Sequence, residues 1–260
     1  MPPAAEHQRR SAVAAAAGRR LRADRARQLA DLLRGQVLSG AFPGGLLPHE
    51  SELAAEYGAS RNTVRQALDM LRGEGLVSRV PGVGTTVACT GKARHGLDRL
   101  MGLAETLHRH GRVTNEVRTA APVAAPAPVA HRLGLAPRTE VLYVERLRRL
   151  DGLPLSLDLT YLPMDVGLGL LDADLEHSDI FRLLEELTGQ RLGQADIALE
   201  AVNADAHAAA VLEAPQGTAL LMLERLTHLA DGRPVDLEFI RFRGDRITMT
   251  GVLQRAGEQL

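Results

Sequence analysis

The chain has 260 residues, a formal net charge of −1, 45% hydrophobic residues and one cysteine, Cys89. Its hydrophobic content is sufficient for a core and excludes a fully disordered protein, and its length allows one large domain or two ordinary ones. One cysteine excludes a disulfide framework, and no apolar run approaches the roughly eighteen residues that a membrane span needs.

The near-zero net charge conceals an asymmetry along the chain. Residues 1–92 contain 13 Lys and Arg against 8 Asp and Glu, a net charge of +5, so the remaining residues carry 18 against 24, a net charge of −6. A basic part followed by an acidic part suggests that only the first meets a polyanion such as nucleic acid.

The N-terminal part of the chain predicts a disordered basic tail over residues 1–24, which are rich in alanine and arginine. Residues 25–90 then predict three helices and a hairpin, over 25–39, 50–57, 61–73 and the strand-like runs 76–80 and 85–89. This order is that of a winged helix-turn-helix, which inserts its third helix into the major groove of double-stranded DNA. The side chains that would lead this helix are polar: Arg61, Asn62, Thr63 and Arg65.

Five stretches of this region follow one family pattern: Leu47-Pro48, Glu52-Leu53-Ala54, Ser60 to Leu68, Glu74 to Val77, and Gly82 to Thr85. In these stretches the chain resembles the DNA-binding domain of the GntR family of bacterial transcription regulators. The resemblance implies DNA contacts from Ser60, Arg61, Asn62, Thr63 and Arg65, with Gly82 and Gly84 shaping the wing. Arg79, at the base of the wing, adds a further cation to the expected DNA face.

Three positions depart from the family pattern. His49 replaces a serine that would cap the second helix, Ser51 replaces a common arginine, and Val83 replaces a basic residue at the wing tip. The last two changes each remove a charge from the DNA face. We therefore expect fewer phosphate contacts and a shallower salt dependence than in a typical member of the family.

Residues 91–99 are expected to link this domain to the next, and residues 97–110 have helical spacing. His108 and His110 lie two residues apart, so on a helix they point to different faces, and no Cys or carboxylate cluster accompanies them. The sequence therefore predicts no metal site here.

An internal repeat begins near residue 130. The two copies share an Ala-Pro, a Glu-Arg-Leu, an Asp-Gly and a proline at spacings that agree within one residue, at 136–154 and 214–234. Asp-Gly between alternating apolar runs predicts a hairpin, so each copy predicts a short helix followed by two strands. Two such units predict one antiparallel sheet with helices on one face, an α+β fold, with a further helix over 179–187 capped by Ser178.

The second half also follows a family pattern, in stretches that include Glu145 to Arg148, Asp151 to Leu155, Tyr161 to Pro163, Ser178 to Phe181, and Arg243 to Arg246. These stretches resemble the UTRA effector-binding domain that defines the HutC subfamily of GntR regulators. The resemblance implies that residues 100–255 form a chorismate lyase-like domain that binds an effector and dimerises. It points to six effector contacts: Arg146, Arg148, Asp158, Ser178, Asp236 and Phe242.

The residues themselves support an anionic ligand. Alternation places Arg146 and Arg148 on one side of a strand, and two guanidiniums suit a sugar phosphate, a carboxylate or a phosphonate. Two structural alternatives stay open. Arg146 has an equivalent in the second repeat, Arg225, so both could simply pair with neighbouring carboxylates, and Ser178 could serve only as a helix cap.

Together these features predict a bacterial, cytoplasmic and nucleoid-associated repressor without cofactor, metal or membrane partner. It would bind a palindromic operator as a homodimer and leave it when a small anionic effector binds. One alternative is a chorismate lyase-like enzyme fused to a DNA-binding domain, but no catalytic set of residues is evident. Another is a GntR regulator with an all-helical sensor, against which the Asp-Gly hairpins argue.

Overall fold

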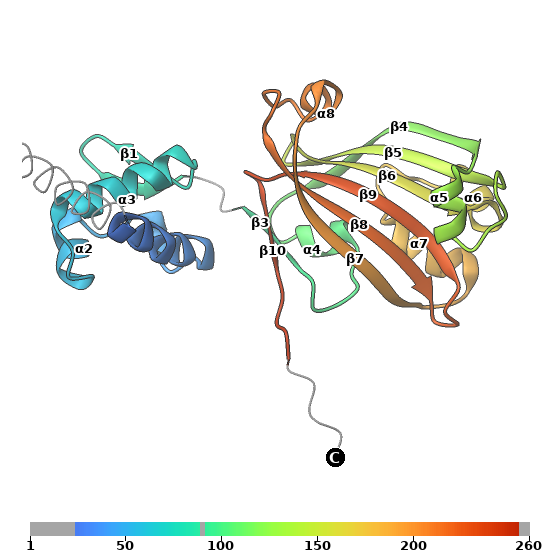
Figure 1. Ribbon diagram of the computed structural model, residues 1–260, viewed down its shortest axis with the longest axis horizontal. Helices are drawn as coiled ribbons and strands as arrows, with labels where there is room; N and C mark the ends of the chain where they lie inside the picture. The colour runs from blue at the N-terminus through green and yellow to red at the C-terminus, as the bar shows by residue number, and fades with distance from the viewer. Residues whose placement is uncertain (1–23, 89–91, 255–260) are drawn as a thin grey trace, which may run out of the picture. The chain divides into compact units, whose positions relative to one another are not determined.

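The computed structural model describes residues 24–88 and 92–254 and divides the chain into two compact units, Met1–Gly91 and Lys92–Leu260 (Figure 1). The expected tail, residues 1–24, lies outside the described residues except for Asp24, which is already helical. No helix in the described ranges is long and apolar enough to cross a membrane.

The first unit is a winged helix-turn-helix, as predicted. It contains a helix whose described part covers 24–39, a 3-10 turn at Pro43–Gly45, α2 (Glu50–Glu56), α3 (Arg61–Gly73), and the antiparallel strands β1 (Val77–Val80) and β2 (Gly84–Val87). The apolar stripes of its helices meet in one core that includes Leu33, Leu53, Val64, Leu68 and Leu71.

The second unit is built around a six-stranded antiparallel sheet with the strand order β4-β5-β6-β9-β8-β7 (Figure 1). The sheet strands are β4 (Val113–Ala124), β5 (Glu140–Leu150), β6 (Leu153–Pro163), β7 (Leu192–Asn203), β8 (Ala219–Leu229) and β9 (Pro234–Arg243). The helices are α4 (Leu103–Leu107), α5 (Ala127–Arg132), α6 (Met164–Leu171), α7 (Ile180–Thr188) and α8 (Ala206–Val211).

The internal repeat is larger than expected, because each copy contributes three strands. The units β4-α5-β5-β6 and β7-α8-β8-β9 meet at the central pair β6–β9. Strand β7 was not predicted from the sequence. It lies at a sheet edge, and most of its residues are exposed on both faces, so it lacks the alternation of apolar and polar residues that indicates a strand.

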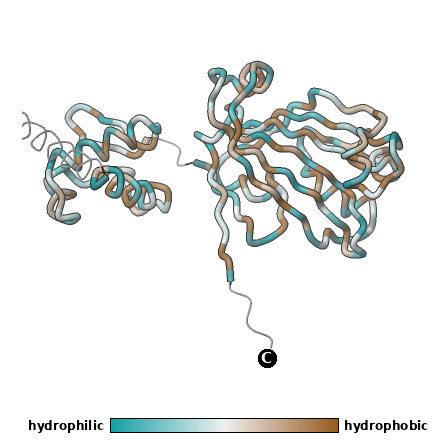
Figure 2. The backbone as a smooth tube through the Cα atoms, viewed as in Figure 1, coloured by the Kyte–Doolittle hydropathy of each residue, from teal (hydrophilic) through white to brown (hydrophobic). Residues whose placement is uncertain are grey.

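Helices cover both faces of the sheet, and the expectation of one covered face was wrong. Apolar clusters pack α5 and α8 on one face and α4, α6 and α7 on the other. This is possible because the central strands are apolar or buried on both sides, as the near-continuous burial of β6 and β9 shows. Figure 2 shows the resulting mixture of hydrophobic and hydrophilic residues along these strands.

The expected linker 91–99 is wrong for its middle part, because Ala93–Gly96 forms strand β3. This strand pairs in parallel with β10 (Ile247–Thr250), a partner about as far away in sequence as the domain allows, so local sequence carried no sign of it. The helix expected over 97–110 shortens to α4, because residues 97–101 form a loop and Gly102 has an extended backbone.

Gly167 provides a test of the packing of α6 on the sheet. A Cβ atom there would lie 2.7 Å from the Cβ of Leu142 on β5, so Gly167→Ala is expected to destabilise the second unit by about 1–3 kcal/mol. The free energy of unfolding, measured in urea, checks this. In the control, Gly35→Ala, the added methyl group meets nothing within 4 Å, and a gain of about 0.5–1 kcal/mol is expected in the first unit. Equal effects of the two changes would contradict this account of Gly167.

Candidate functional site

The DNA-facing surface expected on the first unit forms a shallow hollow of about 310 Å³. It brings together Arg61 and Arg65 from α3 with Arg79 and Gly84 from the wing. The side chain of Arg65 is 65% exposed, and its Nε donates to Oε2 of Glu50 at 2.7 Å. This ion pair holds the Arg65 guanidinium at the surface of α3, so part of its hydrogen-bonding capacity stays open to DNA.

Ser60 and Thr63 fix the start of α3, where Ser60 is the N-cap and is itself exposed. Ser60 Oγ accepts a hydrogen bond from the Thr63 N–H at 3.1 Å and lies 2.8 Å from Thr63 Oγ1, and Thr63 is buried. The two residues therefore orient the exposed Arg61 and Asn62. Their own contacts with DNA stay a prediction.

The wing turn requires glycine at two positions. Gly82 has φ +77° and Gly84 has φ +127°, values that other residues rarely adopt. Val83 between them is 53% exposed, so the wing tip presents an apolar side chain at the position where the family pattern has a basic residue.

The second unit buries an unusual number of charged side chains on one face of its sheet. All of them lie on the central strands β5, β6, β8 and β9, and all have less than a tenth of their surface exposed: Arg146, Arg148, Asp158, Arg225, Asp236 and Glu238. The alternation of side chains along each strand had correctly predicted which of these residues share a face. Burying so much charge is unfavourable unless each charge is paired.

Two ion pairs satisfy part of this buried charge. Arg148 donates to Asp158 Oδ2 from Nη2 at 2.7 Å and from Nε at 3.2 Å, and Ser156 Oγ donates to the other carboxylate oxygen at 2.6 Å. Arg225 donates from Nε to Glu238 Oε2 at 2.8 Å, and its guanidinium lies 4.3 Å from the centre of the Phe181 ring. These contacts occupy Arg148 and Arg225 within the protein.

Arg146 and Asp236 are left without such partners among the described residues. Arg146 is 1% exposed, its Nε has no hydrogen bond, and its Nη1 reaches only the Leu175 carbonyl at 3.5 Å. Asp236 is fully buried, and neither of its carboxylate oxygens is hydrogen-bonded. The hydroxyl of Thr227, directly opposite Asp236 on β8, is also unpaired. We call Arg146, Asp236 and Thr227 the unpaired cluster.

The electrostatics of this cluster follow from burial. Burial, reinforced by Glu238, raises the pKa of Asp236 well above its usual range, although Arg225 and Arg146 oppose the shift. Burial and the neighbouring Arg148 lower the pKa of Arg146. His95 is 2% exposed, and burial together with Arg225 and Arg148 lowers its pKa to about 4, so it is neutral at physiological pH.

A hollow of about 250 Å³ reaches one of the buried charged residues, Arg225, from outside. It is lined by the loop 97–101, by the start of β7, and by His95 and Arg225. His95 and Thr227 were missed in the sequence. Thr227 could have been found from the repeat, because it holds the place of Arg148 in the second copy, whereas His95 lies in the segment taken as a linker.

Two predicted effector residues have different surroundings from those expected. The cap of α7 is Asp179 and not Ser178, because Asp179 accepts hydrogen bonds from the N–H groups of Phe181 at 2.9 Å and Ala104 at 3.2 Å. Phe242 is fully buried in an apolar cluster with Leu155 and others. Effector contacts from Ser178 and Phe242 stay predictions. In the described part of the chain no group of three or more His, Cys, Asp or Glu is arranged to hold a metal ion.

Residues 25–87 match the family described as bacterial regulatory proteins, gntR family, and residues 108–248 match the UTRA domain. The chain belongs to the GntR family of bacterial transcriptional regulators. The UTRA domain gives this GntR regulator the HutC-type arrangement, as the sequence motifs predicted.

Relatives support the same class over most of the chain. The HTH-type transcriptional regulator Rv0792c of Mycobacterium tuberculosis is 32% identical over 234 residues, which is 88% of this chain and 85% of the relative. The HTH-type transcriptional repressor NagR of Bacillus subtilis is 27% identical over 230 residues, 88% and 94% of the two chains. The crystal structure of PhnF from Mycobacterium smegmatis superposes with a TM-score of 0.64 and 28% identity, covering 80% of this chain and 91% of PhnF. The chain is therefore a transcriptional regulator and not an enzyme.

The Arg148–Asp158 pair can be tested by a double-mutant cycle. Arg148→Met is expected to lower the free energy of unfolding by about 3–5 kcal/mol, because it leaves Asp158 charged and buried. Combined with Asp158→Asn, which still offers Ser156 an acceptor, the change should cost much less than the sum of the single changes. Additive losses, measured by urea unfolding, would show that the two charges are not coupled.

Asp236 predicts a pH-dependent stability. Because its folded-state pKa is raised, the folded protein holds this proton longer than the unfolded chain, and stability is lost as pH rises through the interval between the two pKa values. Asp236→Asn removes this loss. The melting temperature of the Asp236→Asn variant should therefore exceed that of the wild type, and the difference should be larger at about pH 8 than at about pH 4. The same difference at both pH values would contradict the raised pKa.

Proposed function

We propose that this regulator is a repressor that binds a palindromic operator as a homodimer and leaves it when a small anionic metabolite binds the unpaired cluster. Its partners are double-stranded DNA, the effector and a second copy of the chain, in the bacterial cytoplasm at the nucleoid. NagR and the mannosyl-D-glycerate transport/metabolism system repressor MngR of Escherichia coli, which is 28% identical over 231 residues, are both named as repressors.

The observation that carries the effector proposal is the lack of partners for Arg146 and Asp236. A buried polar group without a hydrogen bond costs about 1–3 kcal/mol, and a charged one costs more. A ligand that supplies an anionic group to Arg146 and a hydrogen-bonding group to Asp236 and Thr227 would remove these costs on binding. The ligand classes that fit are sugar phosphates, carboxylates and phosphonates.

The pairing of the arginines changes which of them should hold the effector. Arg148 already forms two hydrogen bonds with Asp158, so it positions that carboxylate and adds positive potential. Arg146 has no carboxylate bound and is the stronger candidate for a bidentate contact with the anion. Entry would use the hollow beside His95 and Arg225, with displacement of the loop 97–101.

On the DNA side, Arg61, Asn62 and Arg65 extend from the first turns of α3, where a recognition helix meets base edges. Arg79, Gly82 and Gly84 would set the wing against the phosphate backbone. A dimer of such domains reads two half-sites, which is why we infer a palindromic operator.

The DNA proposal is tested with operators selected by the full-length protein from random duplexes. Arg65→Ala should weaken binding by about 1–3 kcal/mol in mobility-shift titrations, because it removes a group placed to bond a base edge. The matched control is Arg72→Ala, a change at the far end of α3 where Arg72 pairs with Asp69, and it should leave affinity unchanged. Equal losses of affinity in both variants would show that Arg65 acts only through its charge and not through a contact with a base. Light scattering of the complex tests the homodimer.

The effector proposal is tested by a thermal-shift screen of sugar phosphates, carboxylates and phosphonates, followed by operator release with each compound that stabilises the protein. Arg146→Gln should keep operator affinity and lose both the thermal shift and the release. Arg138→Gln, which removes an exposed arginine elsewhere in the domain, is the control and should respond as the wild type does. Release of Arg146→Gln at the wild-type effector concentration would refute the role of Arg146.

A further inference from the structure

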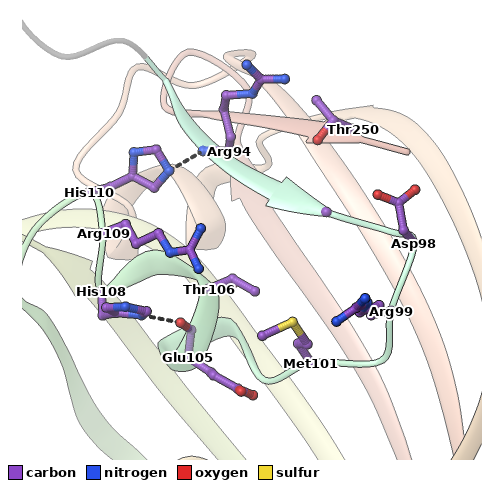
Figure 3. A pocket seen from close by; sticks show the side chains of 11 residues that line it. Arg94, Asp98, Arg99, Met101, Glu105, Thr106, His108, Arg109, His110 and Thr250 are labelled. Atoms are coloured by element: carbon purple, nitrogen blue, oxygen red, sulfur yellow. Dashed lines mark hydrogen bonds between the residues drawn. The ribbon is translucent and has the colours of Figure 1, made fainter. Parts of the chain in front are cut away.

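The segment from β3 through α4 forms a second hollow, of about 430 Å³, that the buried charges do not share. Its lining includes Arg94, Arg99, Met101, Thr106 and Arg109. Figure 3 shows the guanidiniums of Arg99 and Arg109 entering from two sides, with Met101 and Thr106 between them, while Arg94 reaches outward at the rim. The hollow therefore has a basic mouth and a partly apolar floor.

Several arginines of the same domain form ion pairs, although the exposed Arg112 and Arg138 form none within the described residues. Arg118 binds Glu145 at 2.8 Å, Arg149 binds Glu213 at 2.9 Å, and Arg233 binds Asp165. In contrast, neither Arg99 nor Arg109 forms an ion pair or a side-chain hydrogen bond within the described residues. Two guanidiniums thus enter one hollow, and a third stands at its rim, without an ion pair among the described residues.

Two carboxylates and two histidines also line the hollow, but none of them forms an ion pair or a hydrogen bond with the side chain of Arg99 or Arg109. Asp98 accepts a hydrogen bond from the Val252 N–H, and Figure 3 shows Glu105 directed away from the two inner guanidiniums. His110 Nε2 accepts from the Arg94 N–H at 3.2 Å, which leaves its proton on Nδ1, and a ring nitrogen of His108 contacts the Glu105 carbonyl. These contacts hold the walls in place and leave the cations available.

We propose that this hollow binds a phosphate group carried by a small molecule, between Arg99 and Arg109. Guanidinium forks match the oxygens of a phosphate, and the volume is in the range of small-molecule sites, about 300–1,000 Å³. Met101 and Gly96 offer contact to the organic part of a phosphate monoester.

The site is separate from the unpaired cluster and does not rest on the proposed function. Thr106 lines the hollow and bonds His95 Nδ1 at 2.8 Å, so β3 and α4 form the wall between the hollow and the buried charges. None of Arg94, Arg99 and Arg109 belongs to the unpaired cluster, although Arg99 and Met101 also line the hollow proposed as its entrance. Arg146→Gln therefore changes the buried cluster without changing a residue that lines this hollow.

The test uses the full chain carrying Arg146→Gln, so that phosphate bound in the buried cluster does not contribute. Inorganic phosphate and glycerol 3-phosphate are titrated by phosphorus NMR, which reports weak binding through line broadening. Adding R99Q and R109Q should raise the dissociation constant for glycerol 3-phosphate by about tenfold or more. Tighter binding of the monoester than of inorganic phosphate would support a role for Met101 and Gly96.

The matched control is R138Q with R191Q, which removes the same charge from exposed positions outside the hollow. It should leave the dissociation constant unchanged. The proposal is overturned if both double variants bind alike, or if the Arg146→Gln chain binds neither probe. It is also overturned if R99Q with R109Q weakens only duplex DNA, because the arginines would then contact a nucleic-acid backbone.

Discussion

Arg146 and Arg148 extend from the same face of β5 into an interior where only one carboxylate, Asp158, is hydrogen-bonded to either of them among the described residues. Arg148 and Ser156 occupy both oxygens of that carboxylate. Arg146 is then buried as a cation whose charge is balanced only through space, by Asp158, Glu238 and Asp179. Since proteins rarely bury a charge in this way without a partner, Arg146 is the residue on which the proposed effector site depends most.

The internal repeat explains how the asymmetry arises. In the first copy, Arg146 stands opposite Asp158 and Arg148 opposite Ser156; in the second, Arg225 stands opposite Glu238 and Thr227 opposite Asp236. The two copies together hold three arginines and three acidic side chains on this face of the sheet. However, one copy has an extra arginine and the other an extra acid, and each keeps one ion pair. The two residues without a partner, Arg146 and Asp236, are those that the proposed ligand would join through an anionic group and a hydrogen-bonding group.

Sequence reasoning could predict which residues share a face but not which of them bond. Alternation placed Arg146, Arg148, Asp158 and Asp236 on inward faces, because strand periodicity depends only on local residues. The choice of Arg148 over Arg146 as the partner of Asp158 depends on side-chain conformations and on diagonal distances across two strands. The pairing of β3 with β10 and the cap at Asp179 likewise depend on segments far apart in the chain. Periodicity and motifs carry no information about such contacts.

The position of β3 bears on how an effector could act on DNA binding. β3 begins at Ala93, directly after the residues that join the two units, and it holds His95 against Thr106 and beside Arg225 and Arg148. A ligand that reached the unpaired cluster through the hollow beside His95 and Arg225 would pass between the loop 97–101, which continues from β3, and the start of β7. The ligand can change operator affinity only if it binds two conformations with different affinities, and the operator must then change effector affinity by the same factor. Under the proposed function, the loop that a ligand would displace continues directly from β3, the first strand after the connection, so the proposed entrance and that connection lie on one continuous segment.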